Sequence, residues 1–185
     1  GNTFMPTTSN VTRRDEFYYG IYGITRADSY ANNMLENRYQ ASYNQRGWKM
    51  SESWNVDNTD YTFSYGYDAA GNKTSMTYPD NTTNTYIYDE LSRMIRIPGY
   101  FERANGQSGF AYDPVGNMTD MWSTNGIHTQ FTYNTRNMAT GIISTPLSLA
   151  YTYSGNGNIV KITDTTGATP VELNYTYDAK GQLKT

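Results

Sequence analysis

A short motif, aromatic-x-Tyr-Asp-x-x-Gly, recurs along the chain and restricts its possible folds more than any other feature. Its clearest copies begin at Tyr65, Phe110 and Tyr175. The two aromatic residues stand two positions apart, so on a β-strand both rings face the same side. The Asp can accept backbone N–H bonds at the start of a turn, and a Gly three positions later tolerates the positive φ that closes it. Each copy therefore predicts a strand that runs into a tight turn.

Seven copies follow one another at nearly constant spacing. Their second aromatic residue is always Tyr, at positions 43, 67, 88, 112, 133, 153 and 177, so the steps are 24, 21, 24, 21, 20 and 24 residues. The expected turn residues are Asn44, Gly47, Asp68, Gly71, Asp89, Asp113, Gly116, Asn134, Asn137, Gly157, Asp178 and Gly181. The repeat aromatics are Tyr65, Tyr67, Tyr86, Tyr88, Phe110, Tyr112, Phe131, Tyr133, Tyr151, Tyr153, Tyr175 and Tyr177. Ala41 lacks the first aromatic ring of its copy, Ser154 replaces the Asp, and Ser92 replaces the Gly and is the weakest fit. Such a period is typical of a chain built from one supersecondary unit.

Each interval between motifs contains a second group of turn-forming residues, such as Pro79-Asp80-Asn81 or Asn125-Gly126. A unit of 20 to 24 residues is thereby divided into two strands of roughly 6 to 8 residues each. The 19 Tyr residues and the low content of Leu, Val and Ala also favour sheets over helix bundles. We predict an all-β fold, a repetitive antiparallel β-hairpin meander that forms a curved or spiralling sheet with ladders of stacked Tyr.

The repeats divide the chain unequally. We assign residues 1–38 to an N-terminal segment, either irregular, capping or a degenerate repeat, and residues 39–185 to the array of about seven repeats. Residues 17–25 are strand-like in composition, and residues 31–37 are expected to hold a helical turn. Gly1 resembles the remnant of a tag, and no signal-peptide pattern follows it.

Charge and composition make several classes of function improbable. The formal net charge is -3, and no basic cluster is longer than Arg13-Arg14, so we expect no nucleic-acid partner. The chain has no Cys, which rules out disulfides and thiolate metal ligands. No apolar run approaches membrane-spanning length, so we expect no membrane insertion of this segment.

The repeated motif, together with linking stretches such as residues 77–83, resembles the YD repeats of the Rhs (rearrangement hotspot) family over residues 39–185. That family is related to wall-associated proteins, the B and C components of toxin complexes, and teneurins. The resemblance implies a large bacterial secreted or cell-surface protein whose repeats form a β-shell around a C-terminal toxin or effector. The implied partners are the other repeats and that effector. Asp113-Pro114 lies inside an ordinary repeat turn and does not match the autocleavage motif that ends the family's repeat region.

Candidate catalytic and metal-binding groups are few. His128 is the only His, and a general base would need a partner, so we expect a structural or exposed role. The recurring acids could suggest calcium, but calcium takes 6 to 8 oxygen ligands whereas each motif offers one acid. Turn capping is the favoured role of these acids. We predict no enzyme activity, no metal and no cofactor.

Two functions from different classes remain open. The first is a non-catalytic structural segment of the shell. The second is a surface adhesion or carbohydrate-binding module, in which Trp48, Trp54 and Trp122 would form platforms for sugar rings. A short array would also expose unpaired backbone groups at its terminal strands, which predicts self-association through sheet edges.

Overall fold

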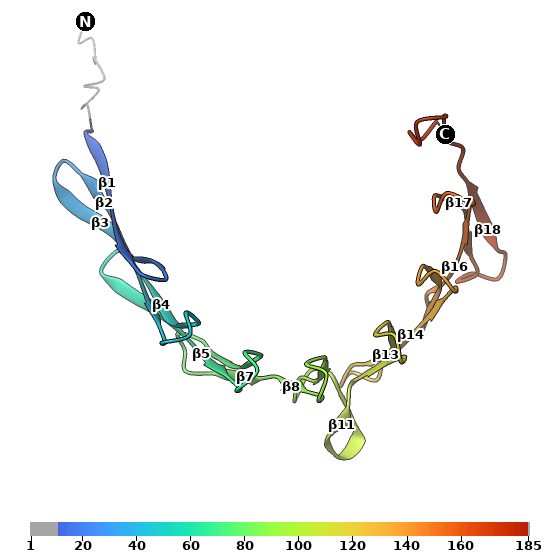
Figure 1. The fold of residues 1–185 in the computed structure, drawn as a ribbon, viewed down its shortest axis with the longest axis horizontal. Coiled ribbons are helices and arrows are strands. Elements are labelled where there is room, and N and C mark those ends of the chain that lie inside the picture. The colour runs from blue at the N-terminus through green and yellow to red at the C-terminus, as the bar shows by residue number, and fades with distance from the viewer. Residues whose placement is uncertain (1–10, 185) are drawn as a thin grey trace, which may run out of the picture. The chain divides into compact units, whose positions relative to one another are not determined.

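A computed structural model describes residues 11–184, and almost every regular element in that range is a β-strand (Figure 1). The single helical element among these residues is a 3-10 turn, η1 (Ala104–Gly106). The chain divides into two compact units, residues 1–85 and 86–185. The prediction of an all-β fold is confirmed.

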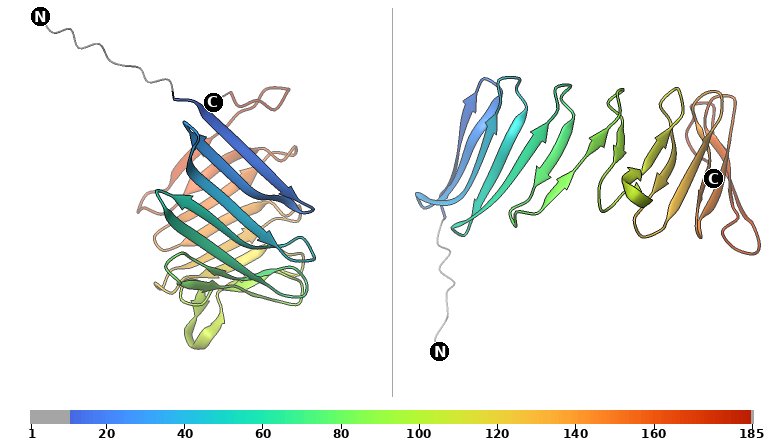
Figure 2. Two further views of the ribbon diagram at one scale, coloured as in Figure 1. Left: turned by 90° about the vertical axis from the view of Figure 1, so that its left-hand side faces the viewer. Right: turned by 90° about the horizontal axis from the view of Figure 1, so that it is seen from below.

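Unit 1 is one open sheet of seven antiparallel strands in sequence order (Figure 2). Its strands are β1 (Arg13–Gly20), β2 (Gly23–Ala31), β3 (Met34–Tyr43), β4 (Lys49–Val56), β5 (Thr59–Tyr67), β6 (Lys73–Thr77) and β7 (Thr83–Thr85). Each strand pairs with the next along the chain, which confirms the antiparallel meander.

Unit 2 contains two short ribbons followed by a second open sheet. The ribbons are β8 (Ile87–Tyr88) with β9 (Met94–Arg96), and β10 (Glu102–Arg103) with β11 (Gln107–Ser108). The sheet consists of β12 (Phe110–Tyr112), β13 (Met118–Trp122), β14 (His128–Tyr133), β15 (Ala139–Ser144), β16 (Ser148–Tyr153), β17 (Ile159–Asp164) and β18 (Val171–Asn174). Its strands also lie in sequence order.

The N-terminal strands are more regular than the sequence suggested. β1 and β2 extend the same sheet as the repeats, and the boundary predicted after residue 38 falls inside β3. The expected helical turn at residues 31–37 is wrong: Asn32 and Asn33 have φ of 51° and 65° and connect β2 to β3. Positive φ at both central residues is what a two-residue hairpin turn of type I′ requires, and Asn adopts it more readily than most residues. A capping role for residues 1–38 stays a prediction, and the feature predicted at Gly1 lies outside the described residues.

Each sheet has one aromatic or aliphatic face and one polar face. Residues that are paired on neighbouring strands share a face, so the pairs define rows that run across each sheet. In unit 1 the aromatic face carries the rows Phe17, Ala27, Tyr39, Trp54, Tyr61 and Glu52, Phe63, and its polar face carries the row Ser42, Ser51, Ser64, Thr77, Thr83. In unit 2 the corresponding apolar row is Phe131, Ile142, Leu149, with Tyr151, Ile162 and Leu173 beside it. Among the described residues, Ala31, Tyr65 and Phe110 are the only buried hydrophobic ones. Packing within either sheet therefore comes from neighbouring strands, not from a second layer.

The repeated turn has the same hydrogen bonds in copy after copy. In the turn that begins at Asp68, the Gly71 N–H donates to the Asp68 carbonyl, and Asp68 Oδ1 accepts the N–H groups of Ala70 and Asn72 at 2.9 Å each. Asn44, Asp89, Asp113, Asn134 and Asp178 accept the equivalent pair of N–H bonds, and the Ser154 hydroxyl accepts one of them. The fourth turn residue has positive φ in every copy: Gly47 79°, Gly71 94°, Ser92 59°, Gly116 98°, Asn137 59°, Gly157 87° and Gly181 76°. Ser92 therefore adopts the same left-handed backbone as the glycines.

These turns predict different costs for three Gly→Ala variants. Gly116 has φ of 98° with open space around a new Cβ, so Gly116→Ala should lower the free energy of unfolding by about 1–2 kcal/mol through backbone strain alone. Gly71→Ala should cost more, because its Cβ would also lie 2.8 Å from the Trp48 ring. Gly155 has open space and no positive φ, so Gly155→Ala is the matched control and should be close to neutral. Urea denaturation of the three variants measures the differences; equal effects at Gly116 and Gly155 would contradict the role of the left-handed turn.

Candidate functional site

The second Tyr of the repeat forms the contact that links one hairpin to the preceding one. Its hydroxyl donates to a backbone carbonyl: Tyr43 to Ile24 (3.2 Å), Tyr67 to Lys49 (2.9 Å), Tyr112 to Met94 (2.6 Å), Tyr133 to Met118 (2.8 Å), Tyr153 to Ala139 (2.6 Å) and Tyr177 to Ile159 (2.8 Å). We call each such bond a tyrosine rung. Except for Ile24, the accepting residue is the first residue of the strand that leaves the previous repeat turn.

The rungs occupy positions where the backbone ladder between hairpins has ended. Pairing of β4 with β5 stops at Ser51 and Ser64, and Tyr67 reaches the Lys49 carbonyl beyond that point. A β-bulge lies at the second Tyr in six copies, between 42 and 43, 66 and 67, 87 and 88, 111 and 112, 132 and 133, and 152 and 153. Bulges bend a strand and re-aim its side chains. The bulge and the rung thus close the gap where neighbouring hairpins separate.

Burial affects the ionisation of three rung hydroxyls. Desolvation by burial raises the pKa of Tyr67, Tyr112 and Tyr133 above the ordinary value of a phenol. Consecutive motif strands are separated by an outgoing strand, which places their backbones about 10 Å apart, or two strand spacings. The predicted stacking of Tyr on Tyr is wrong for these residues: hydroxyl–carbonyl bonds link the second tyrosines to the preceding hairpin, and the Tyr67 ring lies against Trp48, with ring centroids 5.4 Å apart.

The first aromatic residue of the repeat faces the apolar side. Tyr65 and Phe110 are buried, and the Tyr65 hydroxyl donates to Glu52 Oε1 at 2.5 Å. The remaining first aromatics, Tyr86, Phe131, Tyr151 and Tyr175, are half-buried, as is Tyr88 at the end of β8. These residues contribute packing area to the hairpins.

Turn residues of neighbouring repeats also contact each other directly. Arg46 Nη1 donates to the Ala69 carbonyl of the next turn at 2.7 Å, and Arg136 Nη1 donates to the Gly155 carbonyl at 2.8 Å. Arg93 pairs with Asp89 of its own turn and donates to the Asp113 carbonyl at 3.2 Å. The turn edge is therefore cross-linked by guanidinium groups as well as by rungs.

The three Trp residues do not form one row. Trp48 is half-buried between Tyr67 and the Gly71 backbone, whereas Trp54 is 49% exposed on the aromatic face beside Tyr39, at 4.7 Å between ring centroids. Trp122 stacks on His128 at 4.6 Å with the planes 10° apart, and the Arg103 guanidinium lies 4.7 Å from the centre of its ring. Trp122 and Arg103 line a cleft of about 590 Å³ between the hairpin β10–β11 and the turn after β13.

His128 and the repeated acids have structural partners. His128 Nε2 lies 2.8 Å from Asp120 Oδ1, and Gln130 lies 3.5 Å from the same oxygen. The acids of the repeat turns accept backbone N–H bonds of their own turn, and Asn72 and Asn117 side chains add one bond each to Asp68 and Asp113. These bonds lower the pKa of Asp68. Within residues 11–184, no group of three or more His, Cys, Asp or Glu side chains is placed to hold a metal ion. No helix in that range is long and apolar enough to cross a membrane.

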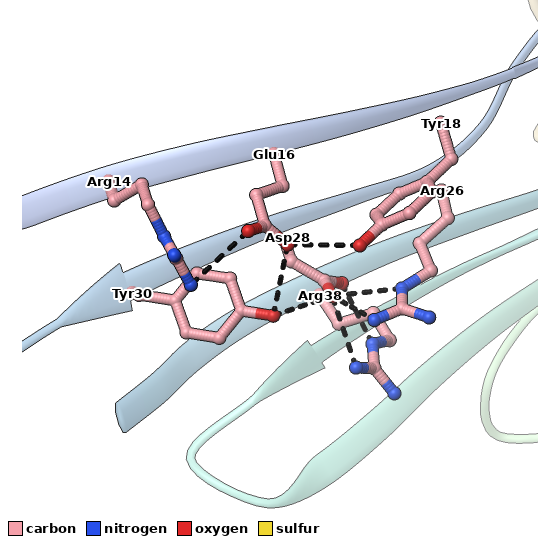
Figure 3. A network of polar contacts seen from close by, with 7 residues as sticks. All are labelled: Arg14, Glu16, Tyr18, Arg26, Asp28, Tyr30 and Arg38. Carbon is pink, nitrogen blue, oxygen red and sulfur yellow. Dashed lines mark hydrogen bonds and ion pairs between the residues drawn. The ribbon is translucent and has the colours of Figure 1, made fainter. Parts of the chain in front are cut away.

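A network of charged and Tyr side chains lies on the polar face of β1, β2 and β3 (Figure 3). Asp28 is 1% exposed and forms ion pairs with Arg26 and Arg38, which approach it from its own strand and from β3. The Tyr30 hydroxyl lies 3.2 Å from Asp28 and 3.4 Å from Glu16, and Arg14 pairs with Glu16 at 3.2 Å. Hydrogen bonds from Arg26 and Arg38 hold the pKa of the Asp28 carboxyl well below its usual range, although burial acts in the opposite direction.

Sequence reasoning missed this network. Its signal is the alternation of charged and Tyr residues in Arg14-x-Glu16-x-Tyr18 and Arg26-x-Asp28-x-Tyr30, which places each set on one face of a strand. The burial of Asp28 depends on the register of three strands, which the repeat motif does not encode.

Comparison with known proteins identifies similar folds. No family model and no curated protein matches the sequence. Among solved structures, TcdB2-TccC3 with Cdc42 superposes with a TM-score of 0.67 at 14% identity, over 94% of this chain and 12% of that chain. The Photorhabdus luminescens Tc holotoxin pore, with the mutation TccC3-D651A, has a TM-score of 0.65 at 15% identity, over 94% of this chain and 11% of that chain. The chain thus shares its fold with about an eighth of these toxin-complex chains.

The rungs predict a difference between two Tyr residues of one strand. Tyr153→Phe removes the bond to the Ala139 carbonyl, and we expect it to lower the free energy of unfolding by about 0.5–1.5 kcal/mol. Tyr151 stands two residues earlier on β16, and its hydroxyl has no hydrogen bond to any residue within 11–184, so Tyr151→Phe is the matched control. Denaturant unfolding of both variants tests this; a smaller loss at Tyr153 than at Tyr151 would rule out the stabilising rung.

The Asp28 network predicts a stability loss in acid. Because the pKa of Asp28 is lowered by folding, its contribution is present above the unfolded pKa of about 3.9 and is lost as pH falls below that value. Asp28→Asn should lower the free energy of unfolding at pH 7 by roughly 1–3 kcal/mol and flatten its pH dependence below about pH 4. Asp15→Asn, at an exposed position of β1, is the control and should keep the wild-type slope. Urea titrations from pH 7 to pH 2 compare the three proteins; a wild-type slope in Asp28→Asn would contradict the prediction.

Proposed function

We propose that this chain is a non-catalytic structural segment of the wall of a β-shell, within a large bacterial secreted or cell-surface protein of the Rhs type. The observation that carries the proposal is the match of 94% of the chain to Tc toxin-complex chains of which it covers only 12%. A wall segment needs strands that continue from repeat to repeat, and the tyrosine rungs and turn-edge arginines supply that continuity. The partners in this proposal are the neighbouring repeats and a C-terminal toxin or effector that the shell encloses or presents.

Single-layer sheets suit such a wall. Because few residues are buried, each sheet is extended rather than packed against a second layer, and both of its faces can contact other molecules. The terminal strands β1 and β18 have a neighbour on one side within the described sheets, so their outer edges can pair with further repeats. In the isolated chain the same edges would support self-association.

Electron microscopy of the full-length gene product tests this role. We expect a hollow particle in which the segment forms part of the wall and a C-terminal domain lies inside. Two Pro substitutions in central strands, Thr62→Pro in β5 and Thr132→Pro in β14, should interrupt the backbone ladder and open the enclosed domain to added protease. A segment that forms a separate domain outside any wall would contradict the proposal.

Carbohydrate binding by a surface adhesion module is the second candidate. The exposed ring of Trp54 and the cleft beside Trp122 are the features that favour it. A glycan array tests this candidate with the wild-type chain and three variants. These are Trp54→Ala, Trp122→Ala and Trp48→Ala, the last of which removes a half-buried ring. Reproducible binding of one defined sugar, lost in either of the first two variants, would favour adhesion over a purely structural role. Absence of enzyme activity is tested separately by a hydrolase screen with His128→Ala as the control.

A further inference from the structure

We propose that the polar face of unit 1 binds a small oxyanion, the group found in carboxylates, sulfate and phosphate, between Arg26, Arg38 and Gln40. The inference rests on the side chains of β2, β3 and β4 and is independent of the proposed wall function. Figure 3 shows the guanidinium groups of Arg26 and Arg38 next to each other, on the same side of Asp28.

More hydrogen-bond donors face Asp28 than its carboxylate can accept. Its two oxygens receive Nε and Nη2 of Arg26, Nε and Nη2 of Arg38, and the Tyr30 hydroxyl. A carboxylate offers about four lone-pair sites for these five contacts, and four of the five fall on Oδ2. Two positive charges on one negative charge leave this group of three side chains with an excess of one positive charge.

Both arginines keep unused N–H donors, and their bonds to Asp28 fix the orientation of those donors. Each guanidinium has five N–H groups and uses Nε and Nη2 on Asp28, and neither Nη1 has a hydrogen-bond partner among residues 11–184. The side chains of Arg26 and Arg38 are 34% and 32% exposed, so both side chains are partly accessible to solutes. Asp28 holds both guanidiniums, and the Tyr18 ring lies 4.6 Å from Arg26 Cζ. Guanidinium groups held in this way bind oxyanions through paired N–H bonds at little entropic cost.

Neutral polar side chains lie next to the two arginines. Gln40 lies directly opposite Arg26, and Ser53 lies directly opposite Gln40, so an amide and a hydroxyl follow the two arginines across the polar face. Three acids of neighbouring positions have partners of their own: Glu16 with Arg14, Tyr18 and Tyr30, Glu36 with Arg13, and Asp60 with the Asn55 amide at 2.6 Å. An oxyanion placed here would have the arginine N–H groups, the Gln40 amide and the Ser53 hydroxyl as donors.

An NMR titration of the intact chain tests the site. Sodium phosphate, sulfate and acetate are added in separate arms at constant ionic strength, with sodium chloride as the monatomic reference. We expect saturable shifts of the Arg26 and Arg38 Nε–H signals and of the Gln40 amide, and the arm that saturates at the lowest concentration identifies the preferred group. Shifts that rise linearly in every arm, or that spread over the whole chain, would overturn the proposal.

Gln40→Glu provides a sharper test because it leaves the pairs with Asp28 in place. The new carboxylate would lie beside Arg26 and compete for the same N–H groups, and we expect affinity for the best anion to fall about tenfold or more. Gln45→Glu makes the same change of charge at an exposed turn position of unit 1 and should retain wild-type affinity. Unchanged affinity in Gln40→Glu, or an equal loss in Gln45→Glu, would contradict a site between the two arginines.

Discussion

The bond from a Tyr hydroxyl to a backbone carbonyl of the preceding hairpin is the interaction on which the repeat array depends. A globular domain normally buries one face of a sheet against a second layer. Within the described residues of its own unit, neither sheet has such a layer, so cohesion has to come from within the sheet. Backbone ladders supply it along the strands, and the rungs supply it at the turn edge, where ladders such as β4–β5 have stopped. Because each rung is local, loss of one weakens one junction between repeats and leaves the others in place.

The strand-turn unit could be predicted from the sequence because its chemistry is local. An Asp, Asn or Ser that caps its own turn and a residue that tolerates positive φ are separated by three positions, so the pattern is visible without tertiary information. Ser92 was the weakest match to the motif, yet its φ of 59° equals that of Asn137. The hydrogen bonds that Asp89 accepts set the backbone of the turn, and Ser92 adopts the left-handed conformation that this backbone requires.

The rungs and the network around Asp28 could not be predicted in the same way, since both depend on how strands align. Two Tyr residues on alternate positions predict a shared face, but the β-bulge before Tyr67 and the Lys49 carbonyl that it reaches are properties of the paired strands. Asp28 joins Arg26 of its own strand to Arg38 ten residues later, which requires the register of β2 with β3. The helical turn expected at residues 31–37 fails for the same reason: Asn32 and Asn33 close a hairpin whose strands extend the sheet.

The two faces of the unit 1 sheet make its two sides chemically different, and this difference bears on any wall built from it. One side presents aromatic rings such as Tyr39, Trp54 and Tyr61, and the other presents hydroxyl groups and the arginines around Asp28. Strand alternation links the two patterns, because a shift of register by one residue would exchange the faces along the whole strand. The ion pair of the buried Asp28 with the partly exposed Arg38 opposes such a shift between β2 and β3, since the shift would separate a buried carboxylate from its partner on the adjacent strand. The same contacts that hold this register also leave the two Nη1 groups without a hydrogen-bond partner among residues 11–184, so on this face a stabilising network and a candidate oxyanion site are built from the same two arginines.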